Sequence, residues 1–229
     1  MNKELFQELI DKSEMEAEIL KHTKDAFSTL KTVLSETEDA YKSFNKKKPS
    51  ATTLEYNDLK GNELELTFGG DVLRFAMHSN VFLIPRYDPI NNTPYLREDS
   101  ERGYCGVINI YNFLSDSFKY KRYDDIGYLI GRILINKENR YFIQGKRELS
   151  RYLNNFSENP LSKKSLEEMV HSAMSYTINF DLLVPPYDQV KEVSVLYFQT
   201  TMENSKLLPT GKRLGFRFAA DIDNPPENV

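Results

Sequence analysis

The residues with the clearest chemical potential lie in the stretch from Gly127 to Leu149, GYLIGRILINKENRYFIQGKREL. Two runs of strand-forming residues flank a polar turn here, which predicts a β-hairpin. The second run ends in Gln144-Gly145-Lys146, and two carboxylates, Asp124 and Asp125, precede the first run. The question is whether the hairpin carries an active site for hydrolysis or is a structural element only.

The Gln144-Gly145-Lys146 pattern resembles the metal-dependent nucleases of the PD-(D/E)xK type. In that family, a strand carrying an Asp is followed by a strand that ends in Glu-x-Lys or Gln-x-Lys. The resemblance implies that acidic groups bind Mg²⁺ and that the lysine assists the attack of water. It covers about 25 residues of the chain, and the acids ahead of the pattern are Asp124 and Asp125.

The pairing of the hairpin decides whether an acid faces Gln144. If residues 136–139 form the turn, Ile135 faces Arg140 and the remaining pairs follow in step. Gln144 then faces Gly131, which has no side chain. The predicted neighbour of Gln144 is therefore not an acid.

Distance also separates Asp125 from this end of the hairpin. It lies six residues beyond Gly131, which is about 20 Å at ~3.3 Å per residue. Oxygen ligands lie only about 2.0–2.6 Å from a divalent cation. We therefore expect no metal site and no catalytic residue here, and we expect Lys146 and Arg147 to open a solvated helix.

Histidine, cysteine and glycine patterns predict no other reaction centre. His22, His78 and His171 are far apart in the sequence and lack the spacing of metal ligands. Cys105 lies in an apolar run, which predicts a buried and unreactive thiol. The glycine-containing turns match neither a phosphate loop nor a nucleophile turn. The sequence thus predicts a non-catalytic protein without a metal or a cofactor.

The segment from Ser117 to Arg151 is locally basic, with nine cations and four acids. It opens with alternating aromatic and cationic side chains, a pattern typical of surfaces that stack bases and follow phosphates. Residues 1–45 are instead acidic, with six lysines and ten acids. The basic segment is therefore expected either to contact this acidic segment, in the same chain or a neighbouring subunit, or to bind nucleic acid. The candidate nucleic-acid-binding residues are Phe118, Lys119, Tyr120, Lys121, Arg122, Lys146 and Arg147.

The elements that position these groups begin with a long helix. Residues 3–45 contain no Gly or Pro, and their apolar side chains recur at heptad spacing as one stripe. One rod of this length is about 60 Å long at ~1.5 Å per residue. The polar residues 12–16, with an S-x-x-E capping box at Ser13–Glu16, also allow two helices with a joint near residue 12. The rod either lies on its own domain or packs on another chain, and the candidate oligomerisation residues are Leu20, Phe27, Leu30, Leu34 and Tyr41.

The rest of the chain predicts a sheet with one further helix. Period-two runs bounded by turn residues indicate strands joined mainly as hairpins. A second amphipathic helix is expected near 162–183, with a capping box that starts at Ser165. Besides the two strands of the 127–149 hairpin, the predicted strands are 63–68, 72–78, a short buried strand at 81–84, 104–111, 190–198 and 214–218. This order favours an α+β fold with a mostly antiparallel sheet.

Residues 86–103 have few periodic apolar side chains and predict a long surface loop. Its side chains Tyr87, Tyr95 and Arg97 are candidates for closing over a ligand. The predicted domains are a helical segment at 1–48 that could form a coiled coil, an α+β domain at 49–221 and a flexible tail at 222–229.

Length and composition set the class of protein. The chain has 229 residues, of which 40% are hydrophobic, and its 14 Tyr and 14 Phe exceed what a disordered chain carries. The formal charge of -4 gives no overall attraction to nucleic acid or to anionic lipid. The single cysteine and the polar N-terminal residues predict a cytoplasmic protein. No run approaches ~18 apolar residues, so no membrane association is expected.

Together these features predict a cytoplasmic, non-catalytic binding or scaffold protein. It is expected to act through self-association, as a homo-oligomer, or by holding a protein partner. The alternative is a nucleic-acid-associated protein that uses the basic and aromatic 117–151 surface, including a metal-dependent nuclease.

Overall fold

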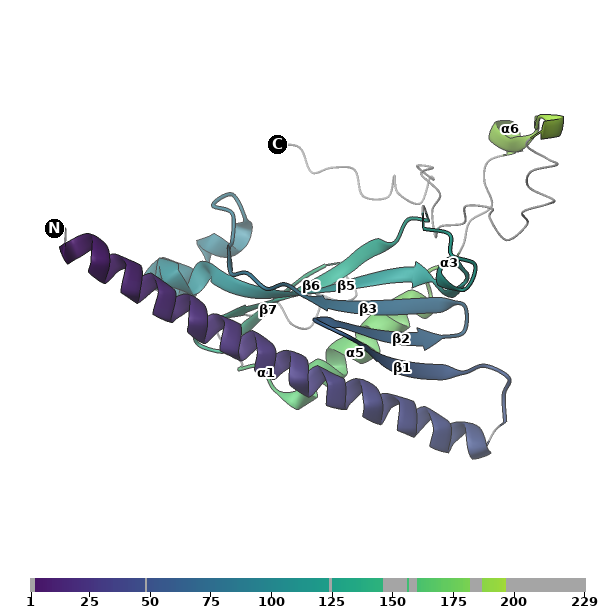
Figure 1. The fold of residues 1–229 in the computed structure, drawn as a ribbon, viewed down its shortest axis with the longest axis horizontal. Helices are drawn as coiled ribbons and strands as arrows, with labels where there is room; N and C mark the ends of the chain where they lie inside the picture. Colours follow the sequence, from purple (N-terminus) through teal and green to yellow (C-terminus); the bar gives the residue numbers. More distant parts are fainter. Residues whose placement is uncertain are drawn as a thin grey trace.

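The computed structural model describes residues 3–47, 49–123, 125–145, 156, 160–181 and 187–196. A long N-terminal helix crosses one face of an antiparallel sheet, and a second amphipathic helix lies on the same side (Figure 1). The α+β fold predicted from the sequence is confirmed.

Helix α1 (Lys3–Lys47) is one unbroken helix of 45 residues, about 68 Å long at ~1.5 Å per residue. The alternative joint near residue 12 does not occur. Ser13 does not cap a new helix, because its hydroxyl donates a hydrogen bond of 2.7 Å to the carbonyl oxygen of Leu9 in the preceding turn. The buried residues of α1 lie between Ile19 and Leu34, so its first turns extend beyond the body of the protein (Figure 1).

Seven strands in the described part of the chain form one sheet in the order β1-β2-β3-β5-β6-β7, with β4 paired to β5. All the pairings are antiparallel. The strands are β1 (Leu54–Leu59), β2 (Glu63–Phe68), β3 (Asp71–Met77), β4 (Phe82–Leu83), β5 (Tyr104–Leu114), β6 (Tyr128–Asn136) and β7 (Tyr141–Gly145). The predicted hairpins at 63–78 and 127–145 are therefore present.

Short helices connect the strands, and α5 (Lys163–Ile178) follows the sheet. The amphipathic helix predicted near 162–183 is present, but its cap is Ser162, whose Oγ accepts a hydrogen bond of 3.1 Å from the Ser165 backbone N–H. The short elements are η1 (Pro89–Asn92), α2 (Pro94–Glu98), η2 (Ser100–Gly103), α3 (Ser115–Lys119) and α6 (Tyr187–Val190).

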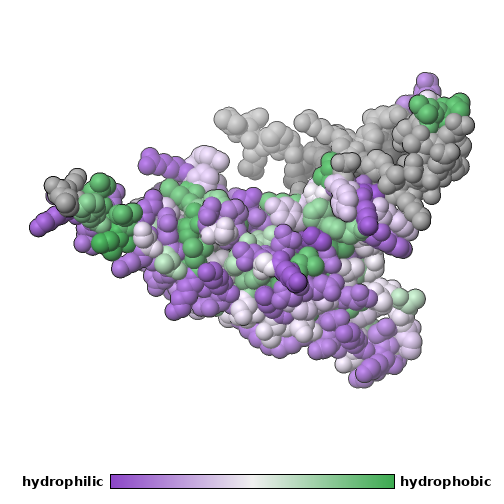
Figure 2. All heavy atoms as spheres, viewed as in Figure 1, coloured by the Kyte–Doolittle hydropathy of each residue, from purple (hydrophilic) through white to green (hydrophobic). Residues whose placement is uncertain are grey.

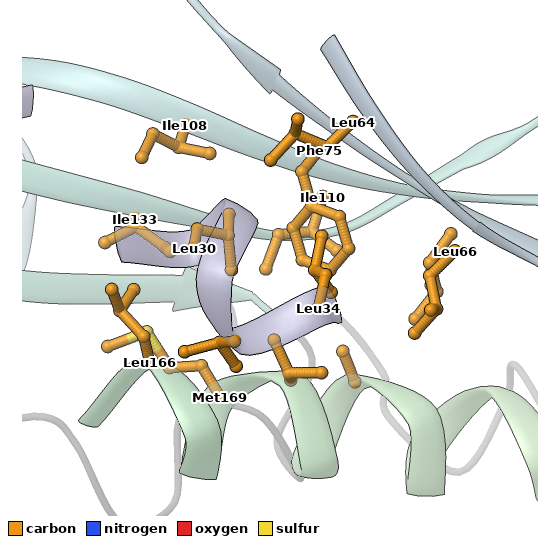
Figure 3. Close-up of a cluster of buried hydrophobic side chains, with 14 of the residues drawn as sticks. Leu30, Leu34, Leu64, Leu66, Phe75, Ile108, Ile110, Ile133, Leu166 and Met169 are labelled. Carbon is orange, nitrogen blue, oxygen red and sulfur yellow. The ribbon is translucent and has the colours of Figure 1, made fainter. Parts of the chain in front are cut away.

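The main core lies between the sheet and the two longer helices. Leu30 and Leu34 of α1 meet Leu166 and Met169 of α5 beneath the inward-facing residues of the strands (Figure 3). A smaller cluster lies on the other face of the sheet, because side chains alternate between the two faces along each strand. It comprises Ile84, Ile90, Leu96, Cys105, Val107, Leu134 and Phe156.

Several local predictions were wrong. The short strand expected to be buried at 81–84 is reduced to β4, where Phe82 and Leu83 are exposed. The loop expected at 86–103 contains three short helices, and β1 was not anticipated. The strand expected at 190–198 is absent from the described residues 187–196. Val193 and Val195 alternate with other residues as in a strand, but both side chains are exposed and neither packs into a core. The strand expected at 214–218 lies outside the described residues.

The register of the β6–β7 hairpin also differs by one residue from the prediction. Ile135 pairs with Tyr141 instead of Arg140. The cause is the turn: the Asn136 N–H donates a hydrogen bond of 3.0 Å to the Arg140 carbonyl, and Asn139 adopts a φ of 54°. The loop therefore has three residues, not four.

Candidate binding sites

The hairpin that resembles a nuclease site brings no acid opposite Gln144. Its cross-strand neighbour is Arg132, where Gly131 was predicted. The Gln144 amide donates a hydrogen bond of 3.3 Å to Asp88 Oδ2, while Asp125 is bonded to other residues beyond the start of β6. In the described part of the chain, no three histidine, cysteine or acidic side chains come together to hold a metal ion. Asp124, Lys146 and Arg147 lie outside the described residues.

The histidines and the cysteine have structural surroundings. The ring of His78 meets Phe82 edge-on at 4.6 Å between centroids. His22 lies 3.9 Å from Glu18 on the same helix, and His171 is exposed. Cys105 is fully buried, and this burial raises the pKa of its thiol far above the ordinary value, as expected for an unreactive cysteine.

The basic and aromatic segment at 118–122 is largely occupied by contacts within the chain. The Arg74 guanidinium lies 4.2 Å from the ring centroid of Phe118. Tyr120 has Lys119 at 5.0 Å and Arg122 at 5.9 Å from its ring centroid. The two rings expected to stack on bases therefore already contact cations of the same chain.

Arg122 is not a free surface cation. Its Nε donates a hydrogen bond of 2.9 Å to Asp125 Oδ2, and the two side chains are only 7% and 2% exposed. Ser117 donates a second hydrogen bond of 2.6 Å to the same oxygen. Lys119 and Lys121 remain exposed. The segment is thus anchored through a buried ion pair.

The candidate oligomerisation residues on α1 divide into two groups. Phe27, Leu30 and Leu34 are buried in the main core of the same chain. Tyr41 packs against that core, and its hydroxyl donates a hydrogen bond of 2.7 Å to the Thr52 carbonyl. Leu20 is only half-buried and lies at the start of the part of α1 that leaves the sheet.

The free end of α1 carries large apolar side chains in contact with water. Leu5, Phe6, Leu9 and Ile10 are between 48% and 63% exposed. Figure 2 shows hydrophobic residues gathered at this end of the molecule. At about 100° per residue, these four side chains share one side of the helix with Ser13, Glu16, Ala17 and Leu20. We call the seven uncharged residues of this side the α1 stripe.

The side of α1 that faces its own domain is polar at this end. A cleft separates it from the segment at 100–104, and the residues that line the cleft include Glu4, Gln7, Glu8, Asp11, Ser100, Glu101 and Tyr104. On a helical wheel, the four α1 residues lie nearly opposite the α1 stripe. Closing α1 onto its own domain would therefore leave the stripe exposed.

A cavity of about 550 Å³ lies on the face of the sheet opposite α1 and α5. Its floor is formed by β5, β6 and β7, and the segment at 78–88 forms a wall. Polar side chains enter it from His78, Asp88, Asn109, Tyr111, Arg132 and Gln144. Of the three loop residues proposed to close over a ligand, Tyr87 is a lining residue, whereas Tyr95 and Arg97 are not.

The outer part of the 86–103 segment is fixed to the β6–β7 turn by polar contacts. Glu138 accepts hydrogen bonds of 2.7 Å from Arg102 Nε and 2.8 Å from the Tyr95 hydroxyl. The Asn136 amide also donates to the Tyr95 hydroxyl at 2.8 Å. Burial and the hydrogen bond to Glu138 raise the pKa of Tyr95 to about 12, although the Asn136 contact opposes this shift. The segment that carries Tyr87 and Asp88 is therefore anchored at its far end.

This network predicts a loss of stability in acid. Burial acts to raise the pKa of Glu138, but the hydrogen bonds from Arg102 and Tyr95 outweigh it, so the pKa is lower than usual. A carboxylate with a lowered folded-state pKa contributes stability above its unfolded pKa, and the contribution is lost as the pH falls towards the folded value. We expect Glu138→Gln to flatten the dependence of the thermal unfolding midpoint on pH between about pH 5 and pH 3.

Circular dichroism melts of both proteins across this range measure the effect. Glu14→Gln is the control, because Glu14 is exposed on α1 and makes no ion pair among the described residues. Equal slopes for wild type and Glu138→Gln would show that the network contributes nothing to acid stability.

Comparisons with protein-family models, with curated proteins and with solved structures find no match to this chain. Among the helices that the structure describes, none has both the length and the apolar character to span a bilayer.

The sequence predicted neither the exposed position of the α1 stripe nor the cavity on the sheet. Leu5, Phe6 and Leu9 were recognisable as apolar residues of α1, but a helical wheel places Leu5 and Leu9 at the same angles as the buried residues Thr23 and Phe27. The sequence alone therefore did not separate the exposed residues from the buried ones. The cavity residues Asn109, Arg132 and Gln144 required the correct register, since they meet only when β5, β6 and β7 are aligned.

Proposed function

We propose that this protein is a non-catalytic binding protein that self-associates through the α1 stripe. The observation that carries the proposal is the position of Leu5, Phe6, Leu9 and Ile10, which are large, exposed and absent from the side of α1 that lines the cleft. An isolated helix end of three or four turns is marginally stable in water. Packing of the stripe on another surface would stabilise it.

A second copy of this chain is the partner that suits the stripe. In a two-fold dimer, the same patch serves both subunits, so no separate complementary surface is required. Three of the six acids at this end of α1, Glu4, Glu8 and Asp11, line the cleft on the other side of the helix. They would point outwards when two stripes meet. The small residues Ser13 and Ala17 would allow the helices to approach closely.

The size of the stripe predicts a dimer that dissociates on dilution. Four half-exposed large side chains present on the order of 400 Å², within the range of the largest apolar patch on a typical monomer. Two such patches bury less than the ~1,600 Å² of a standard stable interface. Self-association is therefore expected to be reversible and dependent on concentration.

Sedimentation velocity of the full chain over a concentration series tests this proposal. We expect the wild type to shift from monomer to dimer as its concentration rises. Leu9→Glu should remain a monomer at concentrations where the wild type dimerises, because a carboxylate would be buried without a partner in the stripe. Glutamate favours helix about as well as leucine, and Leu9 is 63% exposed, so the monomer should stay folded.

Gln7→Glu is the matched control. It adds the same negative charge within the same free turns, but on the side that lines the cleft. It should dimerise like the wild type, apart from a small effect of the added charge. A wild-type monomer at every concentration, or equal dimerisation of Leu9→Glu and wild type, would refute self-association through the stripe.

A further inference from the structure

We propose that the cavity on the open face of the sheet binds an organic carboxylate with an apolar body. This proposal is independent of self-association, because the cavity and the α1 stripe have no residue in common. The volume of about 550 Å³ falls within the ~300–1,000 Å³ of typical small-molecule sites. It is sufficient for a medium-length acyl chain or for one or two fused rings.

The polar centre of the cavity is a row of three side chains across three strands. Arg132 of β6 pairs with Asn109 of β5 on one side and with Gln144 of β7 on the other. Residues directly opposite in neighbouring strands have Cβ atoms about 4.5–5.5 Å apart on the same face. The row thus places a guanidinium between two amides, each of which can donate hydrogen bonds to one anion.

Arg132 is the cation of this row. Among the residues that the structure describes, its half-buried side chain makes no ion pair and no side-chain hydrogen bond. Two other arginines of the domain are paired by contrast: Arg74 with Glu65 at 2.8 Å, and Arg102 with Glu138 at 2.7 Å. An arginine left unpaired in a concave site is positioned to receive an anionic group from a ligand.

The acid that lines the cavity, Asp88, is engaged elsewhere. Its Oδ1 accepts a hydrogen bond of 3.1 Å from the Ile90 N–H and so caps η1, and its Oδ2 accepts from the Gln144 amide at 3.3 Å. Asp88 thereby orients Gln144 and forms no ion pair with Arg132. The charge of Arg132 remains available to the ligand.

The rest of the lining favours an apolar ligand body. Phe82, Leu83 and Ile84 form one wall, and Val107, Leu129 and Leu134 rise from the strands. Gly131 and Gly145 pair with each other beside the polar row, so only backbone lines the cavity at these two positions. Transfer of a hydrocarbon chain from water to these surfaces is favourable at ~25 cal/mol per Å² of apolar area.

The hydrogen-bond donors of the polar row determine which head group the ligand carries. A carboxylate is planar, carries one charge and accepts two parallel hydrogen bonds from a guanidinium. A neutral head group would leave Arg132 unpaired in the complex, at a cost in affinity. A polyphosphate would bring more negative charge than one arginine can match. An amphipathic monocarboxylate therefore fits both the charge and the walls.

Isothermal titration of the full chain with decanoate tests the proposal. We expect saturable binding of one decanoate per chain, much weaker binding of its neutral analogue decanamide, and no binding of acetate, which lacks an apolar body. Arg132→Met keeps an unbranched apolar stem and removes the guanidinium and its charge. It should weaken decanoate binding about tenfold to a hundredfold and leave decanamide binding nearly unchanged.

Arg97→Met is the matched control, because Arg97 is exposed and lies outside the cavity lining. The Arg97→Met protein should bind decanoate with the same affinity as the wild type. Gln144→Leu provides a second test on an exposed residue if Arg132→Met does not fold, and it should also weaken decanoate binding. Absence of decanoate binding to the wild type would overturn the proposal. So would equal affinity for decanamide, or an unchanged affinity in both cavity variants.

Discussion

Replacing Gly106 by alanine is expected to destabilise the protein by about 3 kcal/mol, at the upper end of the usual cost of overpacking. Gly106 lies on β5 directly beneath α1. A Cβ atom at this position would collide with Thr23 Oγ1 and lie 2.9 Å from Thr23 Cβ. Thr23 is fully buried, and its hydroxyl is fixed by a hydrogen bond of 2.7 Å to the Ile19 carbonyl. The helix would have to move away from the sheet, and urea denaturation followed by circular dichroism measures the loss.

Gly103→Ala is the matched control, at the residue that precedes β5. A Cβ atom there would meet only Leu83 Cδ1 at 3.4 Å, so its effect should stay within about 1 kcal/mol. Thr23→Gly removes the colliding atoms. It costs stability by itself as a glycine within a helix, but combined with Gly106→Ala it should show a favourable coupling energy. A stable Gly106→Ala protein without such coupling would contradict the close packing of α1 on β5.

The long helix was predictable from composition, but which surface each of its sides contacts was not. The absence of Gly and Pro over residues 3–45 and the heptad stripe indicated one rod, which is what the structure shows. The stripe alone could not decide whether Phe27, Leu30 and Leu34 cover the chain's own sheet or a second chain. That choice depends on contacts with strands and with α5 that are distant in the sequence.

The cavity depends on a detail that the sequence leaves open. Its central row exists because Gln144 pairs with Arg132, and a shift by one residue would turn one of these side chains to the other face. The shift was decided by Asn139, which adopts a left-handed φ that asparagine tolerates better than most residues. Turn length could not be deduced from the run Asn136-Lys137-Glu138-Asn139, since both three-residue and four-residue loops accept these residue types.

At Val193 and Val195 the sequence pattern predicted a strand that the structure does not contain. Period two predicts a strand only where a neighbouring strand and a core face are available. Both side chains are exposed, at 53% and 74%, and the preceding residues Tyr187–Val190 form α6. Local pattern was sufficient for β2, β3 and β5 because each of them has a partner strand on both sides.

Replacing Asp125 by alanine is expected to cost about 3–5 kcal/mol, the usual penalty for breaking a buried ion pair. The Arg122 side chain is 7% exposed, and its Nε lies 2.9 Å from Asp125 Oδ2. Without the carboxylate, its positive charge would remain buried and the Ser117 hydroxyl would lose its acceptor. The free energy of unfolding, measured by urea denaturation, should fall accordingly.

This ion pair also determines how nucleic-acid binding by the 117–151 surface can be tested. Arg122→Ala would leave Asp125 buried without its cation, so reduced binding by that variant would report on unfolding as well as on contact with phosphate. Lys119 and Lys121 are exposed, and their replacement by alanine tests phosphate contact directly through the salt dependence of single-strand binding.

The Lys31–Asp58 pair supplies the control for Asp125→Ala. Its nitrogen and oxygen are also 2.9 Å apart, but the side chains are 38% and 48% exposed, and pairs of this kind contribute about 0–1 kcal/mol. Asp58→Ala should therefore be nearly neutral, whereas the double variant Arg122→Met/Asp125→Ala should recover part of the stability lost by Asp125→Ala, because it removes the uncompensated charge. If Asp125→Ala and Asp58→Ala cost the same, burial does not determine the contribution of the Arg122–Asp125 pair, and the segment at 115–125 is held by other contacts.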